Sequence, residues 1–304
     1  MSTDFNQAAT DVIAAPELPA ILSAPRASGR LRRFLDQHSM IVLGGALLAI
    51  LVLVAIFAPW IAPHDPAKLS PISRLKGPSA THWFGTDALG RDIFSRVAYG
   101  ARVSLVIGLT VAVVSTAGGL LVGLVSGYVR WADGIIMRVI DGLMSIPAIL
   151  IAIALMALTR GSVQNVIIAI TIAEIPRVAR LARGTVLSLR EQPYVEAAIT
   201  CGTSTPLIIW RHILPNTLGP MTVQATYICA SAMMTEAILS FIGAGIPPTV
   251  PSWGTIMAEG RTLWQIAFHI IAFPAVFLGI AVLGINMLGD GLRDHFDPRT
   301  ARKG

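Results

Sequence analysis

The sequence predicts an all-α integral membrane protein with six transmembrane helices. Its 304 residues are 54% hydrophobic and only 13% charged, and the mean hydropathy is +0.69, far from the balance of a water-soluble domain. Several long stretches lack Asp, Glu, Lys and Arg, and about 20 apolar residues are enough for a helix to cross a bilayer. Lys and Arg are also distributed unevenly between the segments that join these stretches, which orients the chain.

The six spans follow from the charge-free stretches. Five of them are long enough by themselves: 41–63, 103–129, 142–159, 216–235 and 262–289. The fourth span in chain order starts at Gly161 and is too short unless it continues through Glu174 and Pro176. Pro147 is expected to kink the third span, because proline removes a backbone hydrogen bond.

The segments outside the spans complete the predicted organisation. Residues 1–37 are rich in Ala, Pro and Ser and are expected to form a disordered cytoplasmic tail. Residues 38–63 form a first transmembrane helix that is retained, because the apolar run is longer than the core of a secretory signal. Residues 64–100 form an extracytoplasmic segment, and residues 291–304 form a cytoplasmic C-terminal tail. In the second span, glycines four residues apart predict a close helix–helix contact: Gly119, Gly123 and Gly127.

Charge placement predicts that both termini are cytoplasmic. Of the 23 Lys and Arg residues, 15 fall on segments that are then inside and 8 on segments that are outside. The net charge of +6 therefore reflects membrane orientation. No interleaved pattern of aromatic and basic residues suggests a nucleic-acid partner.

The stretch 193–215 predicts two short helices on the cytoplasmic surface. Pro193 suits the first turn of a helix, and Gly202 can end that helix with a positive φ. A second helix follows, with Pro206 near its start and Pro215 at its end. Two short helices joined at a glycine beside the membrane are typical of a docking surface for another protein.

This stretch resembles the "EAA" loop of the membrane subunits of ABC importers, through Glu196-Ala197-Ala198, Gly202 and Ile213-Leu214-Pro215. The run Arg211 to Asn216 is similar to the version found in dipeptide, oligopeptide and nickel permeases, although His212 replaces an aliphatic residue of the looser pattern. Further similar segments lie at 84–92, 99–105, 236–245 and 286–294, which is typical of the C-type subunit.

The resemblance implies a type I ABC importer transmembrane domain at 101–290 with a cytoplasmic coupling loop at 185–216. In that family the loop docks into a groove of the ATPase subunit. The residues expected to carry docking are Tyr194, Glu196, Ala197, Ala198, Gly202, Arg211 and Pro215.

The function that the resemblance implies is that of a permease subunit of an ATP-driven, binding-protein-dependent importer in the bacterial cytoplasmic (inner) membrane. Di- and oligopeptides are the expected solutes, with nickel or another small solute as the alternative. The implied partners are a second homologous permease subunit, two ABC ATPase subunits, an extracytoplasmic solute-binding protein and membrane lipid. No cofactor is expected on this chain, since ATP and Mg would be bound by the ATPases. This agrees with the lysines Lys68, Lys76 and Lys303, none of which lies in a P-loop.

Two other function classes remain open from the residues alone. Glu236 is the one acid deep in the fifth span, and Asp141 lies one helical turn from Arg138 near the membrane surface. Each acid is a candidate for a helix–helix bond or for the lining of a pathway, and an ion-coupled secondary transporter would use one of them as its proton site. A membrane enzyme would bind a metal at Asp290 and Asp294. We predict no catalytic residue and no metal site, because no His or Cys cluster has metal-ligand spacing.

Overall fold

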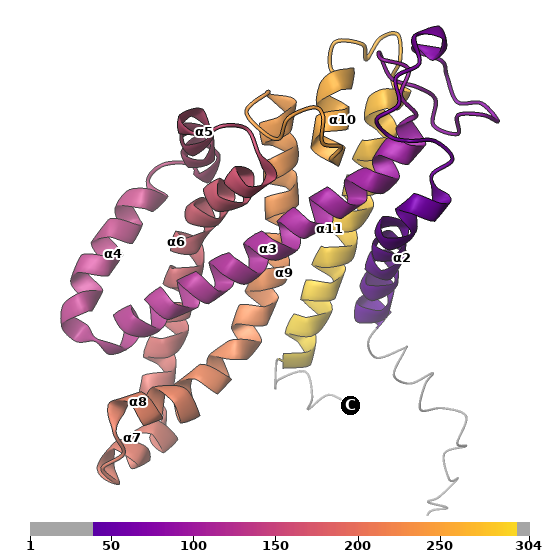
Figure 1. The fold of residues 1–304 in the computed structure, drawn as a ribbon. Helices are drawn as coiled ribbons and strands as arrows, with labels where there is room; N and C mark the ends of the chain where they lie inside the picture. The colour runs from indigo at the N-terminus through magenta and orange to yellow at the C-terminus, as the bar shows by residue number, and fades with distance from the viewer. Residues whose placement is uncertain (1–38, 297–304) are drawn as a thin grey trace, which may run out of the picture. The chain divides into compact units, whose positions relative to one another are not determined.

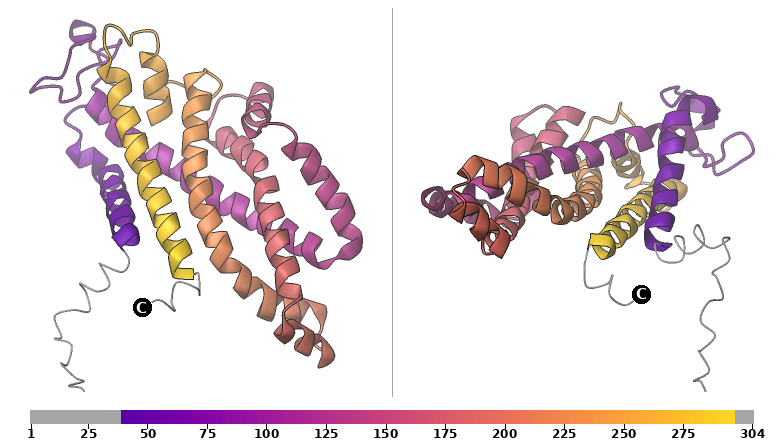
Figure 2. Two further views of the ribbon diagram at one scale, coloured as in Figure 1. Left: turned by 180° about the vertical axis from the view of Figure 1, so that it is seen from behind. Right: turned by 90° about the horizontal axis from the view of Figure 1, so that it is seen from below.

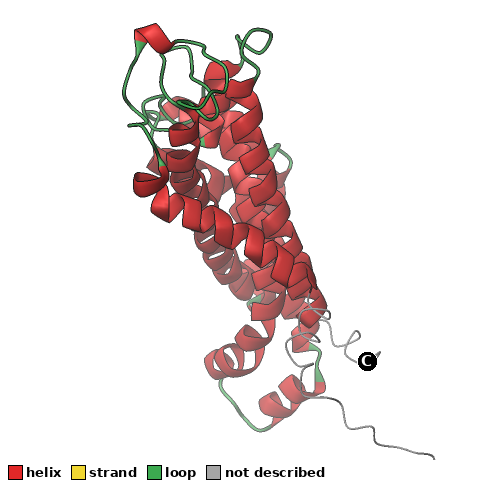
Figure 3. Ribbon diagram, turned by 90° about the vertical axis from the view of Figure 1, so that its right-hand side faces the viewer, coloured by secondary structure: helices red, strands yellow, loops and turns green. Residues whose placement is uncertain are grey.

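The computed structural model describes residues 39–296. All the regular secondary-structure elements in this range are helices (Figures 1 and 3). Five long helices form the body: α2 (Ser39–Ile61), α3 (Ile93–Tyr128), α6 (Val163–Arg190), α9 (Leu214–Phe241) and α11 (His269–Phe296). Shorter elements connect them: η3 (Pro71–Ser73), α4 (Arg130–Met144), α5 (Ala148–Leu158), α7 (Pro193–Thr200), α8 (Thr205–Ile208), η4 (Ile209–Ile213) and α10 (Trp253–Gly260). The tail predicted at 1–37 and residues 297–304 of the C-terminal tail lie outside the described residues.

The helices confirm the predicted membrane fold. By length and composition α2, α3 and α11 can each cross a bilayer, and the bent pair α4–α5 makes a fourth if its two helices form one span. Helices α6 and α9 have 28 residues each. At about 1.5 Å per residue such a helix is about 42 Å long, which exceeds the hydrocarbon core of about 30 Å. Six segments thus correspond to the six predicted spans, and α6 and α9 are the more polar of them.

Three predicted boundaries differ from the structure. Helix α3 begins at Ile93, ahead of the span predicted from 103, because the Asp92 side chain caps it by accepting from the Ser95 N–H. The third span is not one straight helix, since α4 and α5 meet at an angle of 86° beside Pro147. Helix α6 continues past Pro176 to Arg190. Its apolar part and its row of arginines therefore belong to one rigid element.

Helix α3 crosses α6 and α9, and its glycine row faces α6 (Figures 1 and 2). A Cβ atom at Gly119 would meet Val178, one at Gly123 would meet Ala182, and one at Gly127 would meet Val186. The absence of side chains lets the two backbones approach closely, which is how helices associate without a hydrophobic driving force in lipid. The close contact predicted from these glycines is confirmed.

Replacing Gly123 by valine should separate α3 from α6 and destabilise the chain. Overpacking a closely packed contact costs about 1–3 kcal/mol, and here the obstructing atoms include backbone. Thermal unfolding in detergent, followed by tryptophan fluorescence, measures the loss. Gly142→Val is the control, because a Cβ at Gly142 meets nothing within 4 Å in this chain. Equal losses in the two variants would contradict the role of the glycine row.

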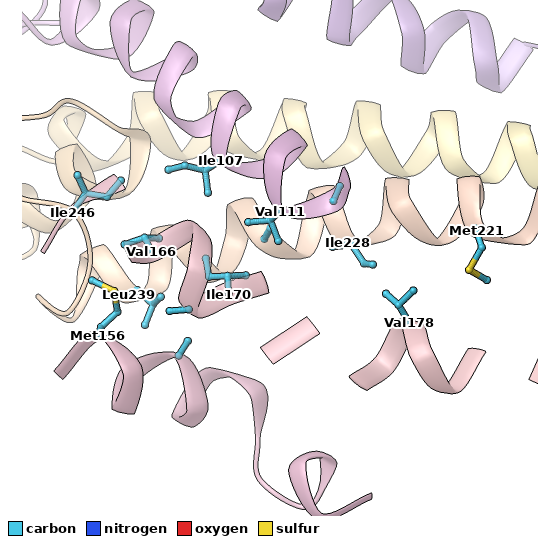
Figure 4. Packing of buried hydrophobic residues seen from close by; sticks show 14 of the residues in the cluster. Ile107, Val111, Met156, Val166, Ile170, Val178, Met221, Ile228, Leu239 and Ile246 are labelled. Atoms are coloured by element: carbon cyan, nitrogen blue, oxygen red, sulfur yellow. The ribbon is translucent and has the colours of Figure 1, made fainter. Parts of the chain in front are cut away.

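Two apolar clusters hold the long helices together. The first joins α3, α5, α6 and α9, and Figure 4 shows Ile107 and Val111 of α3 facing Ile170 of α6 and Ile228 of α9. The second joins the N-terminal half of α3 to α2, α10 and α11 around the fully buried Trp253. Trp253 Nε1 donates to the Val97 carbonyl at 3.1 Å, so the indole N–H is satisfied inside the membrane protein.

Helix α2 contains Pro59, which cannot donate to the Ala55 carbonyl one turn earlier. The Arg102 side chain of α3 replaces that donor, because its Nε donates to Ala55 O and its Nη2 donates to Ile56 O at 2.8 Å. Unsatisfied carbonyls in lipid are costly. Arg102 therefore joins the end of α2 to α3.

Candidate functional site

The predicted docking stretch lies at one end of the helix assembly, and the loop before α3 lies with α10 at the other end (Figures 1 and 3). Helix α7 begins with Pro193 at its first turn and ends at Gly202, whose φ is +76°. The Gly202 N–H donates to Ile199 O at 2.9 Å, and the Thr203 N–H donates to Ala198 O at 3.1 Å. This pair of bonds is a Schellman motif, in which glycine is the favoured residue. The positive φ predicted at Gly202 is confirmed.

The second short helix does not end at Pro215, which corrects the prediction. Helix α8 passes directly into the π-helical turn η4, which continues into α9 at Leu214. Pro215 lies in the first turn of α9, and the helical backbone runs through it from η4. The stretch is thus joined without a break to a long membrane helix, so that a displacement of α8 moves α9.

Apolar side chains fix the inner face of the stretch to the ends of α3 and α6. Val195 of α7, Ile208 of α8 and Ile213 of η4 are buried in one cluster with Leu124 of α3 and Val186 of α6. The Arg190 guanidinium at the end of α6 donates to Gly127 O at 2.8 Å and lies over the Tyr128 ring at 5.1 Å. The short helices therefore rest on rigid membrane helices.

The face of the stretch that points away from α3 and α6 is exposed. Six of the seven residues expected to carry docking are exposed and Ala198 is half-buried against the cluster; the exposed six are Tyr194, Glu196, Ala197, Gly202, Arg211 and Pro215. The sequence reasoning missed three exposed apolar side chains on the same stretch: Ile199, Leu207 and Trp210. Trp210 is 71% exposed, and a large exposed aromatic residue is typical of a protein interface. Its position before the Arg211 motif is the signal that could have identified it.

Polar contacts link the two ends of the stretch. The Asn216 amide donates to His212 O at 2.6 Å and to the Tyr194 hydroxyl at 3.4 Å, and the Tyr194 and His212 rings lie 6.2 Å apart. Glu196 lines a pocket of about 370 Å³ together with Arg130 and Arg190. The same pocket is also lined by the acids Asp133 and Glu191, so acidic and basic side chains are mixed there.

Acid–arginine pairs join α4 to α6, and a serine hydrogen bond joins α9 to α6. Asp141 is paired with Arg180 of α6 rather than with Arg138, because α4 packs along α6. Asp133 is held by Arg183 in two parallel bonds of 2.5 and 2.6 Å. Within α6, Glu174 pairs with Arg177 at 3.2 Å despite the intervening proline, and it also accepts from Ser231 of α9 at 3.4 Å. Arg180 and Arg183 of α6 thus attach α4 to α6.

Glu236 bonds α9 to α10. Its Oε1 accepts from Ser240 Oγ and from Ser252 Oγ, both at 2.8 Å, and Ser252 caps the start of α10. The residue is only 1% exposed. These bonds favour the helix–helix interpretation of Glu236, and the interhelical ion pair does the same for Asp141. That either acid lines a pathway stays a prediction.

A groove of about 800 Å³ opens between α6 and α9. Its walls are residues of α6 from Arg177 to Leu189 and residues of α9 from Asn216 to Gln224, with Met144 of α4. It therefore lies directly above the docking stretch and between the two helices that the stretch connects.

A buried ion-pair network at the opposite end was not predicted. Arg96 of α3 is 1% exposed, and its Nη1 donates to Asp87 Oδ2 at 2.6 Å while its Nη2 donates to Glu259 Oε1 of α10 at 3.0 Å. Arg91 donates to the same two carboxylates at 2.7 and 2.6 Å. Two acids and two arginines thus join the loop before α3, α3 itself and α10. The sequence spacing indicates the pairing of Asp87 with Arg91, but not the distant Glu259.

Metal-type ligands meet at one place among residues 39–296, and it is not the place considered from the sequence. Asp290 and Asp294 are both exposed near the end of α11, and within the described chain they do not meet a third His, Cys or carboxylate ligand. His64, His82 and Asp92 do meet, at the outer end of α3. Spacing along the chain gave no signal for this cluster, because its members are far apart in the sequence.

Comparisons with known proteins agree with this geometry. Residues 119–302 match the family profile described as "Binding-protein-dependent transport system inner membrane component", and residues 30–78 match "N-terminal TM domain of oligopeptide transport permease C". A probable peptide ABC transporter permease of Sinorhizobium fredii is 50% identical over 93% of this chain and 99% of its own length. A dipeptide transport permease of Alkalihalophilus pseudofirmus is 42% identical over 87% and 88% of the two chains.

A glutathione transport permease of Escherichia coli is 44% identical over 88% of this chain and 89% of its own. Among solved structures, the MetNI methionine ABC transporter matches with a TM-score of 0.55 and 21% identity. That match covers 64% of this chain and 93% of the other, and it shows the fold alone.

Proposed function

The chain belongs to the family of binding-protein-dependent transport system inner membrane components, and we propose that it conducts di- and oligopeptides across the bacterial cytoplasmic membrane as the permease subunit of an ATP-driven importer. The names of its relatives support this substrate class, since they refer to peptides, to dipeptides and to the tripeptide glutathione. Selectivity within the class would rest largely on the solute-binding protein that delivers the peptide.

The observation that carries the proposal is the exposed helix pair fixed to two membrane helices. An ATPase subunit that grips the outer face of α7, α8 and η4 would push on the apolar cluster of Val195, Ile208 and Ile213. That force would reach α6 and α3 through the cluster, and α9 through the unbroken η4–α9 junction. Close-packed elements move as rigid bodies, so small displacements at the loop become changes between inward-open and outward-open arrangements.

The groove between α6 and α9 supports a pathway at this position. Its walls are two helices that the docking stretch joins, so both walls would respond to the ATPase. A peptide carries charged termini, and Arg177 of α6 together with Asn216 and Gln224 of α9 would supply polar contacts from the two walls. A second, homologous permease subunit would close the other side.

The proposed assembly has five kinds of component: this chain, the second permease, two ATPases that bind ATP and Mg, the extracytoplasmic binding protein and membrane lipid. In the proposed assembly the docking stretch and both termini lie on the cytoplasmic side of the membrane. The network of Arg96 then lies on the outer side, where the binding protein would dock.

Purification in mild detergent tests the proposal. We expect this chain to bring down a second permease and two ATPase subunits, and we expect peptides with the cognate binding protein to stimulate ATP hydrolysis in vesicles containing the complex. Ni²⁺ serves as the competing solute. Stimulation by Ni²⁺ and not by peptides would overturn the substrate class. Uptake that proceeds without ATPase subunits and stops when an uncoupler is added would contradict the proposal that import is driven by ATP.

A further inference from the structure

Three possible metal ligands converge at the outer end of α3, on a part of the chain that the proposed transport function does not use. His64 directly follows the end of α2, His82 lies in the loop before α3, and Asp92 caps α3. One ligand atom from each lies within 4.8 Å of the other two. His82 Nδ1 is 2.9 Å from Asp92 Oδ1, and His64 Nδ1 is 4.0 Å from the same oxygen.

These distances are close to those around a bound ion. With metal–ligand bonds of about 2.0–2.2 Å in a tetrahedron, neighbouring ligand atoms lie about 3.4 Å apart. One observed distance is somewhat shorter and the other somewhat longer than this. The third separation, between the two histidine nitrogens, is within 4.8 Å, so the imidazole rings would turn by up to about 1.4 Å relative to one another to bring all three atoms onto one ion.

Surrounding bonds already hold the ligands in place. Asp92 Oδ2 accepts from the Ser95 N–H at 2.8 Å and from Ser95 Oγ at 2.7 Å, which leaves Oδ1 facing the two histidines. The backbone N–H of His64 donates to Ser95 Oγ at 3.3 Å, which joins the segment after α2 to the N-terminal cap of α3. Bonds from the surroundings that orient metal ligands are typical of metal centres in proteins.

The ligand atoms also have the right accessibility. Asp92 is 2% exposed, and His64 Nδ1 is buried with no hydrogen-bond partner among the described residues. The rest of the His64 side chain is 38% exposed, which provides an entry path. An adjoining pocket of about 220 Å³ has room for a water as fourth ligand; besides the three ligands it includes Asp65, Lys68 and Ser70. The charges of Asp65 and Lys68 offset each other.

We propose that His64, His82 and Asp92 bind a divalent metal ion of the zinc class. Two imidazole nitrogens and one carboxylate suit Zn²⁺ and its neighbours Ni²⁺ and Co²⁺, whereas Mg²⁺ and Ca²⁺ prefer oxygen ligands throughout. The ion would connect the end of α2, the outer loop and the start of α3. The proposal of this metal site does not depend on the peptide-transport proposal.

Metal binding by the full-length chain tests this site. The protein is purified through a tag without histidines, treated with a chelator and dialysed against buffered ZnCl₂, and bound zinc is measured by mass spectrometry. We expect one tightly held Zn²⁺ per chain in the wild type. His64→Ala and His82→Asn should each weaken binding at least about tenfold, as loss of a ligand or its support does. The matched control His212→Asn, in the cytoplasmic stretch, should bind like the wild type.

Cobalt supplies a second readout. Co²⁺ in place of Zn²⁺ should give the strong visible absorption of a tetrahedral site in the wild type and in His212→Asn, but not in His64→Ala. The metal-free His64→Ala chain should unfold close to the wild-type temperature, because this side chain is partly exposed, its Nδ1 makes no hydrogen bond, and the ring contact with His82 is the main interaction that is lost. Equal zinc content in the wild type and His64→Ala, or an octahedral cobalt spectrum, would overturn the site and leave a simple hydrogen bond between His82 and Asp92.

Discussion

Replacing Gly202 by valine should lower peptide uptake about tenfold or more, while the amount of the protein in the membrane stays unchanged. Gly202 has a φ of +76°, and a left-handed backbone costs a residue with a Cβ about 1–2 kcal/mol, more for a β-branched one. A Cβ here meets nothing within 4 Å, so the damage comes from the backbone and not from a clash within the chain. The Schellman bonds that end α7 would break, and the outer faces of α7 and α8 would no longer be held at a fixed angle.

Gly202→Asn is the matched control. Asparagine adopts the left-handed conformation more readily than other residues with a Cβ, so it should keep most of the uptake. Uptake is measured in cells that express the complete transporter, with membrane content followed by immunoblotting. If valine and asparagine impair uptake to the same degree, the fixed backbone is not what matters. If neither impairs it, the docking surface is not formed by this turn.

Replacing Arg96 by methionine should destabilise the chain by about 3–5 kcal/mol, the usual effect of removing one partner of a buried ion pair. Arg96 lies between Asp87 and Glu259, and the side chains of Arg96 and Asp87 are each 1% exposed. Without Arg96 the two acids would share only Arg91, and one negative charge would be left uncompensated in a nearly dry environment. The outer loop and α10 would then lose their attachment to α3.

Thermal unfolding in detergent measures this effect, and a loss of this size corresponds to a fall in the midpoint of about 10 °C. Arg74→Met is the control, because Arg74 lies on the same outer segment but is exposed. The double variant Arg96→Met with Glu259→Gln should recover part of the loss, since it removes a positive and a negative charge together. A double variant that is as unstable as the sum of the two single variants would contradict a coupled network.

Local patterns predicted those parts of the fold that depend on neighbouring residues. Charge-free stretches located five of the six membrane segments, because charged side chains are costly in a bilayer; the sixth, α6, contains Glu174. The spacing of Gly119, Gly123 and Gly127 predicted a face without side chains, and that face packs on α6. Gly202 after a short helical pattern predicted a left-handed turn, because glycine has the least cost there.

Helix boundaries were less predictable because they depend on single caps and breaks. Asp92 begins α3 well before the charge-free span does; the apolar pattern from Ile93 to Val103 indicated a helix in the interface, but not that it is continuous with the span. Pro147 was expected to kink a helix, but it separates two helices that lie at 86°. Pro215 was expected to end a helix and instead stands in the first turn of α9, since η4 carries the helical backbone across.

Contacts between distant residues could not be predicted from one sequence. The spacing on a helix indicates partners one turn away, which favoured Arg138 for Asp141, whereas α4 packs along α6 and brings Arg180 instead. For the same reason the pairing of Arg96 with Glu259 could not be predicted. The cluster of His64, His82 and Asp92 could not be predicted either, because its three members meet only when α2 and α3 are packed together.

Labelling of Cys201 with a membrane-impermeant maleimide tests the central claim most directly. Cys201 is exposed between α7 and α8, and replacing Cys229 by serine leaves it as the one thiol in the chain. We expect labelling in inside-out vesicles and none in intact spheroplasts, with the rate in vesicles rising after the ATPase subunits have been stripped away. Labelling from the outer side of the membrane, or a rate that does not change when the ATPases are removed, would contradict a cytoplasmic docking surface on α7 and α8.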